Sequence, residues 1–178
     1  MKHAVGPRRE LGLRTLFNVL GPLTNPAGVK RQVLGVYDAA LCEPLAEALV
    51  RLGSEHALVL HSEDGLDEIS IAATTQGYEC KAGKISPIEI DPAALAYAHD
   101  SLDGLQVDTA EHSAYLIRSA LGGDDDPVSI KARSMIMLNA GAGIYVSGIA
   151  DSLASGIVSA EKAMASGAAA QKLEAFVD

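Results

Sequence analysis

The sequence predicts an α/β fold with a mostly parallel sheet flanked by helices, an appended antiparallel hairpin and a helical C-terminal third. Two short apolar runs enclose an amphipathic helical pattern within about thirty residues, as in a βαβ unit with parallel strands and a right-handed crossover. Further β-like runs, separated by glycine-containing pairs, then indicate hairpins. After Asp91-Pro92 the apolar residues recur with a helical period.

The first segment combines a helical pattern with a loop. Pro7 can open a helix, and apolar residues recur close to the helical period over Arg8–Val19, although Gly12 interrupts them. We expect one broken helix or two short ones there. Gly21–Gly28 contains two prolines and two glycines in eight residues, so it is predicted to be a loop of fixed shape.

The βαβ unit follows this loop. The apolar run Gln32–Tyr37 predicts the first strand, and Glu43–Leu52 places its leucines on one helical face before Gly53 ends the helix. His56–His61 is the second apolar run, and it predicts a strand parallel to the first.

Three short β-like runs come next: Ile69–Thr74, Tyr78–Lys81 and Lys84–Glu89. Gln76-Gly77 and Ala82-Gly83 separate these runs and are typical of hairpin turns. Antiparallel strands are therefore expected beside the parallel ones.

Helices are predicted for most of the C-terminal third. Their expected ranges are Pro92–Tyr97, Thr109–Leu121, Val128–Ile149, Ser152–Ser166 and Ala168–Val177. The acidic run Asp124–Asp126 precedes Pro127 and is interpreted as a solvated loop that favours the N-terminus of the next helix, rather than as a metal site.

Composition excludes several classes of protein. The 178 residues are 48% hydrophobic and 21% charged, which is typical of a folded domain and not of a disordered chain. The net charge of −9 repels a phosphate backbone, so we expect no nucleic-acid partner. No apolar stretch is long enough to span a membrane. Cys42 and Cys80 form no C-x-x-C pair and are predicted to be free thiols in the cytoplasm.

The acidic loop Asp64–Glu68 directly follows the predicted strand His56–His61. Open α/β sheets bind ligands at the carboxyl ends of their strands, and carboxylates on a loop can converge on Mg²⁺ bound to substrate phosphates. The alternative is that Asp64-Gly65 makes a turn while Asp67 and Glu68 face water. The residue pattern alone leaves both interpretations open.

Other candidate groups carry weaker signals. Arg8, Arg9 and Arg14 can grip a carboxylate or phosphate, or can be surface residues of an amphipathic helix. The histidines lack metal-ligand spacing, and no nucleophile motif of an acyl transferase is present. Gly141–Gly143 lies within a helical pattern, which favours close helix packing over phosphate binding.

Blocks of residues over nearly the whole chain form one ordered pattern. They are Met1-Lys2, Arg8–Gly12, Arg14-Thr15, Phe17-Asn18, Leu20–Ala27, Gln32–Tyr37, Asp64–Ser70, Leu138–Ala140 and Tyr145–Gly148. In this order they closely resemble the C-terminal half of the anthranilate phosphoribosyltransferase family. The resemblance implies the catalytic-domain fold shared by nucleoside phosphorylases and phosphoribosyltransferases, in incomplete form.

The resemblance also implies an activity, which is transfer of phosphoribosyl from 5-phosphoribosyl diphosphate to anthranilate, releasing diphosphate, in tryptophan biosynthesis. Asp67 and Glu68 match the family's metal-binding pair, which implies Mg²⁺. Arg8 matches the arginine that contacts anthranilate, and Pro22 matches a proline lining the path of that substrate. Mg²⁺ held by carboxylates can stabilise the negative charge that develops on diphosphate as it leaves. No catalytic base is assigned, because an aromatic amine is uncharged at neutral pH.

The chain departs from the family pattern in places. Arg133-Ser134 stands where Arg-Asp is common, and Asp108–Ser113 differs from a more usual ending in Glu-Asn-Ala, which bears on helix packing. The family's glycine-rich phosphate loop and N-terminal helical dimerisation region precede the point that Met1 matches. Residues 1–178 are therefore expected to be the C-terminal part of the α/β domain, inactive alone and without the region through which the family forms homodimers.

Two other functions remain as alternatives. A pyrimidine nucleoside phosphorylase relative shares the fold, and a screen with thymidine and phosphate would reveal it. A non-catalytic nucleic-acid-binding protein of the same fold is disfavoured by the net charge of −9. A truncated product without independent function is the remaining possibility.

Overall fold

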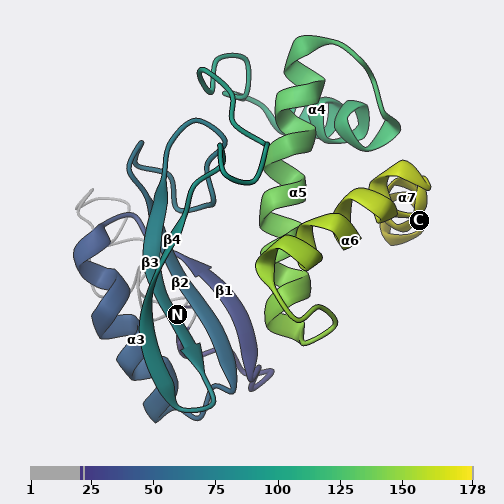
Figure 1. Cartoon of the computed structure of the whole chain (residues 1–178). Coiled ribbons are helices and arrows are strands. Elements are labelled where there is room, and N and C mark those ends of the chain that lie inside the picture. The colour runs from purple at the N-terminus through teal and green to yellow at the C-terminus, as the bar shows by residue number, and fades with distance from the viewer. Residues whose placement is uncertain (1–20, 22, 178) are drawn as a thin grey trace, which may run out of the picture.

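The computed structural model describes residue 21 and residues 23–177 (Figure 1). The helix predicted over Arg8–Val19 lies outside them. Gly21 and Leu23 take helical geometry, so the irregular segment begins at Thr24 and not at Gly21. The elements in chain order are β1 (Arg31–Gly35), η2 (Ala39–Leu41), α3 (Cys42–Arg51), β2 (His56–Ser62), β3 (Thr75–Lys81), β4 (Lys84–Ile90), α4 (Ala110–Gly122), α5 (Pro127–Ser147), α6 (Leu153–Ala165) and α7 (Ala168–Val177).

The α/β class, the hairpin and the helical C-terminal part are confirmed. The strands form one four-stranded sheet in the order β1-β2-β3-β4. β1 and β2 are parallel and joined through α3, as the βαβ prediction required, whereas β2–β3 and β3–β4 are antiparallel. The expectation of a mostly parallel sheet is wrong for the described residues. The chain returns directly from β2 through β3 to β4 without a second helical crossover.

The hairpin turn at Ala82-Gly83 is confirmed. Both residues have positive φ, 50° and 77°, and they connect the paired Lys81 and Lys84. Positive φ at both central positions matches the right-handed twist of the flanking strands. The predicted turn at Gln76-Gly77 is wrong, because both residues lie within β3. A Cβ on Gly77 would lie 1.9 Å from the carbonyl oxygen of Val59, so this glycine permits close strand approach.

The run Ile69–Thr74 is not a strand. Ile69 and Ile71 are both fully buried, which explains the alternating apolar pattern. Side chains, however, satisfy the backbone N–H groups that a neighbouring strand would otherwise bind. The N–H of Ile69 donates to Asn139, that of Ser70 to Thr75 and that of Ala72 to the Ser70 hydroxyl. Pro92–Tyr97 forms turns and no helix, and Ala96 has a positive φ of 64°.

Side-chain caps begin three of the helices, and left-handed glycines end two of them. The side chains of Thr109, Asp126 and Ser152 accept backbone N–H groups at the starts of α4, α5 and α6. Gly123 and Gly148 end α4 and α5 in the left-handed conformation. The acidic run before Pro127 thus favours the next helix as predicted, through the side chain of Asp126.

The core of the described residues has three parts. One lies on each face of the sheet, beneath α3 and α5, which cover opposite faces in Figure 1. A third, smaller cluster joins α4 and α5 through Leu116, Ala120 and Ala132. In β2, Ala57 and Val59 pack with α3 residues such as Leu49, whereas Leu58 and Leu60 pack with α5 residues such as Leu138. The burial of β2 on both faces explains why its sequence is continuously apolar. No helix within the described part of the chain is long and apolar enough to cross a membrane.

Two glycines bring α5 and α6 together. A Cβ on Gly141 would lie 2.5 Å from Cγ1 of Ile157, and a Cβ on Gly156 would lie 2.2 Å from the Gly141 carbonyl oxygen. Space around Gly143 is open. Of the two glycines for which the sequence predicts close helix packing, Gly141 and Gly143, the structure therefore gives that role to Gly141, with Gly156 on α6 as its partner.

Candidate functional site

The acidic loop lies where the sequence analysis expected it, at the carboxyl end of β2. β1 ends beside it, because the two strands run parallel with Gly35 opposite Leu60. The carboxyl ends of parallel strands are where open α/β sheets bind ligands. Position alone therefore makes this loop the leading candidate site among the described residues.

Local hydrogen bonds give the loop its shape. The backbone N–H of Gly65 donates to Ser62 at 2.9 Å, and Gly65 takes a left-handed φ of 90°. The N–H of Ser62 donates to the Leu66 carbonyl at 2.9 Å. These bonds form a tight turn, as the alternative interpretation of Asp64-Gly65 proposed.

Asp64 takes part in this turn. Its Oδ2 accepts a 2.5 Å hydrogen bond from the hydroxyl of Ser70. Burial acts to raise the pKa of Asp64, but hydrogen bonds from Ser70, Ser62 and Leu66 lower it below its ordinary value. The carboxylate stays ionised and is occupied within the protein, so its role is to shape the loop.

Asp67 and Glu68 differ from Asp64. All three residues are exposed, so Asp67 and Glu68 face water as the alternative interpretation predicted. The difference is that neither Asp67 nor Glu68 forms an ion pair or side-chain hydrogen bond with another described residue. Desolvation by the surrounding protein and the neighbouring charge of Asp67 both raise the pKa of Glu68. No described Lys, Arg or His side chain pairs with these two repelling carboxylates, and such a pair could hold a divalent ion.

Asp67 and Glu68 offer two adjacent carboxylates, which could hold Mg²⁺. The described residues contain no group of three or more His, Cys, Asp or Glu side chains able to hold a metal. Mg²⁺ typically keeps several waters and binds through one or two carboxylates together with substrate phosphates. Asp67 and Glu68 are suited to that arrangement, in which the substrate supplies the remaining oxygens.

An apolar groove of ≈ 390 Å³ adjoins the acidic pair. It lies between the loop, the segment 102–107 and helices α4 and α5. Its lining residues are Leu66, Asp67, Glu68, Leu102, Leu105, Gln106, Val107, Ser113, Leu116, Ile117, Ala132, Met135 and Ile136. The two carboxylates are the charged groups among them.

Two residues that were not predicted as site residues contact the backbone on either side of Glu68. A Cβ on Gly35 would lie 1.5 Å from the carbonyl oxygen of Asp67. The side-chain amide of Asn139 forms hydrogen bonds of 2.9 Å with both the N–H and the carbonyl of Ile69. Two features of the sequence could have pointed to these residues. Gly35 is a glycine at the end of a strand, and Asn139 is a polar residue in an apolar stretch of helix.

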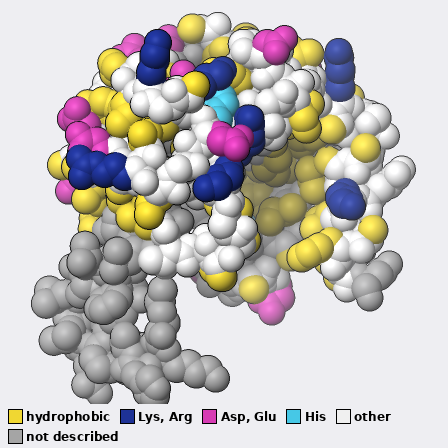
Figure 2. Space-filling view, turned by 90° about the horizontal axis from the view of Figure 1, so that it is seen from below, with side chains coloured by type: hydrophobic (Ala, Val, Ile, Leu, Met, Phe, Trp, Pro, Cys, Tyr) yellow, Lys and Arg dark blue, Asp and Glu magenta, His cyan; other side chains and the backbone are white. Residues whose placement is uncertain are grey.

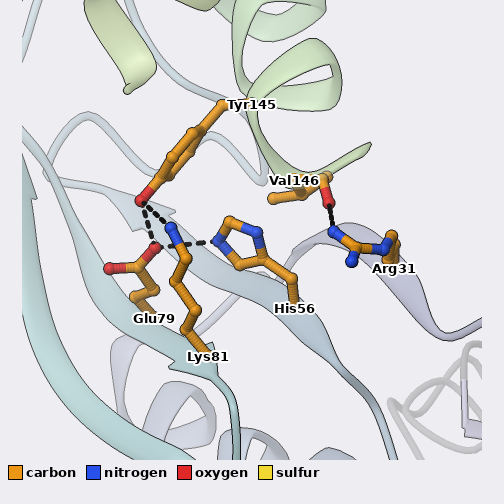
Figure 3. Close-up of polar contacts among 6 residues, drawn as sticks. All are labelled: Arg31, His56, Glu79, Lys81, Tyr145 and Val146. Atoms are coloured by element: carbon orange, nitrogen blue, oxygen red, sulfur yellow. Dashed lines mark hydrogen bonds and ion pairs between the residues drawn. The ribbon is translucent and has the colours of Figure 1, made fainter. Parts of the chain in front are cut away.

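A polar network ties the C-terminal end of α5 to the sheet (Figure 3). The hydroxyl of Tyr145 donates to Oε1 of Glu79 at 2.6 Å, and His56 Nε2 lies 2.8 Å from the same oxygen. Lys81 Nζ donates to the Tyr145 hydroxyl at 3.2 Å. In β1, Arg31 donates to the Val146 carbonyl at 3.0 Å.

The network perturbs its acidic members. Burial acts to raise the pKa of Glu79, but hydrogen bonds from Tyr145 and His56 lower it below the ordinary value. Burial and the hydrogen bond to Glu79 raise the pKa of Tyr145. With the His56 ring edge-on to Tyr145, centroids 4.7 Å apart, these groups form a satisfied structural contact.

Some of the remaining predicted groups lie outside the described residues, and the others have structural roles. Arg8, Arg9, Arg14 and Pro22 lie outside the described residues. Three of the four described histidines, His56, His61 and His99, have ring partners within the protein, namely Glu79, the Val36 carbonyl and Ser134. Cys42 and Cys80 are free and buried, as predicted.

Comparison with known proteins places this geometry in context. The family model described as "Glycosyl transferase family, a/b domain" matches residues 1–170. The anthranilate phosphoribosyltransferase of Saccharophagus degradans is 57% identical over 178 residues, covering 100% of this chain and 52% of the relative. That of Marinobacter nauticus is 53% identical, with the same coverage. The chain thus spans about half the length of these curated relatives.

Solved structures agree. The anthranilate phosphoribosyltransferase of Thermus thermophilus superposes with a TM-score of 0.86 at 38% identity, covering 99% of this chain and 51% of that one. The Saccharomyces cerevisiae enzyme in complex with PRPP and Mg gives 0.84 at 28% identity, covering 100% and 50%. The same yeast enzyme has also been solved with 4-fluoroanthranilate.

Proposed function

Because the chain belongs to the glycosyl transferase family, a/b domain, we propose that it is the C-terminal part of an anthranilate phosphoribosyltransferase. The reaction joins the phosphoribosyl group of 5-phosphoribosyl diphosphate to the amine of anthranilate, yielding N-(5-phosphoribosyl)anthranilate and diphosphate in tryptophan biosynthesis. The observation that carries this proposal is the exposed pair Asp67–Glu68, which lacks partners among the described residues and lies at the ligand-binding edge of the sheet.

Asp67 and Glu68 would hold Mg²⁺ together with oxygens of the diphosphate. When bound, Mg²⁺ neutralises the negative charge that develops on diphosphate as the glycosidic C1–O bond breaks. The two carboxylates orient the diphosphate end of the substrate relative to the sheet edge. Such fixed positioning lowers the barrier because the leaving group needs no reorganisation during the reaction.

The aromatic substrate would be recognised elsewhere in this chain. Arg8 is proposed to bind the carboxylate of anthranilate, since a guanidinium can form two parallel hydrogen bonds with a carboxylate. Pro22 is proposed to line the path of the aromatic ring. The amine attacks C1 of the ribose without a dedicated general base, because it carries no positive charge at neutral pH.

The other half of the family's length would supply the rest of the site. We propose that it contributes the glycine-rich phosphate loop and the homodimer contacts, so that this chain alone is inactive. A cytoplasmic location, expected from the separate free cysteines, is part of the same proposal.

The test compares the 178-residue chain with a joined enzyme, in which it is fused to the part of the Saccharophagus degradans relative that it does not match. Turnover is followed by the loss of anthranilate fluorescence on adding 5-phosphoribosyl diphosphate and Mg²⁺. The joined enzyme should be active and the chain alone inactive. Turnover by the chain alone contradicts the need for the other half, and an inactive, folded joined enzyme contradicts the assigned reaction.

Variants of the joined enzyme test the metal assignment. Asp67→Asn and Glu68→Gln should each raise the Mg²⁺ concentration for half-maximal rate at least about tenfold, since even outer-shell changes cost that much. Glu63→Gln is the matched control. Glu63 is exposed beside the same loop, and its carboxylate accepts a 3.0 Å hydrogen bond from Gln76. Unchanged Mg²⁺ dependence in both acidic-pair variants would remove the metal assignment.

Neither alternative function is favoured. The relatives reported above carry the name of one enzyme, and it is not a nucleoside phosphorylase. For nucleic acid, Figure 2 shows that the Lys and Arg side chains of the described residues lie singly and in small groups on the face viewed and form no continuous stripe there. The net charge of −9 points the same way.

A further inference from the structure

The acidic pair is carried by a short backbone segment that two distant elements contact, and we propose that Asn139 and Gly35 are positioning residues for Asp67 and Glu68. This inference rests on the proposed metal role of the pair. Through their contacts with the backbone, Asn139 and Gly35 would determine where the two carboxylates lie.

Asn139 contacts the segment from α5. Its Oδ1 accepts the N–H of Ile69 and its Nδ2 donates to the carbonyl of Ile69, both at 2.9 Å. One side-chain amide thus satisfies both backbone groups of a residue that a sheet neighbour would otherwise pair. Ile69 is fully buried, so neither group has ready access to water if Asn139 is removed.

Asn139 is itself held in place. Its Nδ2 also donates to the carbonyl of Met135, one turn earlier in α5, at 3.0 Å. This bond fixes the orientation of the amide, so that its oxygen faces the Ile69 N–H and its nitrogen faces the Ile69 carbonyl. The side chain therefore acts as a rigid extension of the helix.

Gly35 contacts the segment from the end of β1. A Cβ at this position would lie 1.5 Å from the carbonyl oxygen of Asp67 and 2.4 Å from its carbonyl carbon. Because the clash is with backbone atoms, no side-chain movement can relieve it. Only glycine lets the backbone of Asp67 approach the strand this closely.

The two contacts bracket Glu68. Gly35 permits the close approach of the preceding residue's backbone to β1, and Asn139 holds that of the following one by two hydrogen bonds. The Asp67 and Glu68 side chains form no hydrogen bond or ion pair with the rest of the described chain, so their starting points are set by the backbone. A shift of this segment would move both carboxylates together.

The first measurement needs no metal. Amide hydrogen exchange of Ile69 is compared between the 178-residue chain and its Asn139→Ala variant. Loss of the acceptor should accelerate exchange of the Ile69 amide at least about tenfold relative to amides in β2. Unchanged relative exchange overturns the role of Asn139 in holding the segment.

The second measurement uses the joined enzyme. Asn139→Ala and Gly35→Ala should each raise the Mg²⁺ concentration for half-maximal rate roughly ten- to a hundredfold, with a smaller effect on the KM for anthranilate. Gly35→Ala acts from a different element, so it keeps the test decisive if Asn139→Ala does not fold. Folded variants with unchanged Mg²⁺ dependence overturn the inference.

Tyr145→Phe is the control for general loosening of α5. It removes the bonds to Glu79 and Lys81 but touches no atom of the acidic segment. It should lower thermal stability while leaving Ile69 exchange and Mg²⁺ dependence unchanged. If the acidic-pair variants themselves leave Mg²⁺ dependence unchanged, the proposed function has failed. If they alter it and the Asn139 and Gly35 variants do not, only the positioning inference has failed.

Discussion

Tyr145 donates a 2.6 Å hydrogen bond from its hydroxyl to Oε1 of Glu79, joining the end of α5 to β3 across 66 residues of sequence. The same oxygen lies 2.8 Å from Nε2 of the buried His56. One carboxylate oxygen therefore connects a helix with two adjacent strands, at the sheet face that also carries the apolar core beneath α5.

Removing this hydroxyl should destabilise the fold. Tyr145→Phe keeps the ring against His56 but leaves Glu79 with one bond fewer, which we expect to cost about 1–2 kcal/mol of unfolding free energy. Urea unfolding followed by circular dichroism measures it. An unchanged unfolding midpoint would show that the bond contributes nothing net.

The same carboxylate gives stability a dependence on pH. Hydrogen bonds in the folded state hold the pKa of Glu79 below its ordinary value of 4.5. The ionised group therefore stabilises the fold above the unfolded-state pKa, and this contribution disappears as pH falls through the folded-state pKa. The stability difference between the parent and Glu79→Gln should be largest near neutral pH and shrink below about pH 4. A difference that grows on acidification would contradict the assignment.

Glu68 should show the opposite sign. Desolvation and the charge of Asp67 raise its folded-state pKa, so the ionised group opposes folding and this cost increases as pH rises through that pKa. Glu68→Gln should therefore raise thermal stability at neutral pH, by a few tenths of a kcal/mol because the side chain is exposed. Scanning calorimetry of the metal-free chain tests this. A lower melting temperature for Glu68→Gln would mean that the carboxylate has a stabilising partner.

Gly141 and Gly143 of α5 allow a controlled test of helix packing, because Gly141 contacts α6 and Gly143 meets open space. Gly141→Ala places a methyl group 2.7 Å from the backbone of Ile157, which we expect to destabilise the protein by about 1–3 kcal/mol. Gly143→Ala meets open space and should be neutral or stabilise by up to about 1 kcal/mol, since alanine favours helix. Equal effects of the two changes on the unfolding midpoint would contradict the close contact between α5 and α6.

Much of the fold could be predicted from local patterns. The apolar runs Gln32–Tyr37 and His56–His61, with the helical pattern between them, are enough to predict the βαβ unit. The pair Ala82-Gly83 is enough to predict the hairpin. These features depend on neighbours in sequence. The predicted turn at Gln76-Gly77 failed because Gly77 serves a contact with Val59 in another strand, which local sequence does not encode.

The candidate site likewise contains residues that local sequence predicts and contacts that it does not predict. The sequence predicts Asp67 and Glu68 as the metal-binding pair, because they lie on the loop after a strand and match a known motif, and this assignment stays a prediction. The bonds between Asn139 and Ile69 could not be predicted, because the two residues are 70 positions apart and meet only when α5 packs on the sheet. The run Ile69–Thr74 has the alternating apolar pattern of a strand, so the sequence predicts one there. In the structure, side chains and not a neighbouring strand accept its backbone N–H groups, and local sequence does not reveal this.

The central claim, that Asp67 and Glu68 hold a divalent ion together with diphosphate, is tested most directly by metal binding. Mn²⁺ serves as a paramagnetic substitute for Mg²⁺, and the joined enzyme is titrated in the presence of diphosphate. The readout is the enhanced relaxation rate of water protons, which Mn²⁺ bound to the slowly tumbling protein produces and the small Mn²⁺–diphosphate complex does not. We predict that the Asp67→Asn/Glu68→Gln double variant binds Mn²⁺ at least about tenfold more weakly than the parent, while Glu63→Gln binds as the parent does. Equal Mn²⁺ affinity for the folded double variant and the parent would contradict the account.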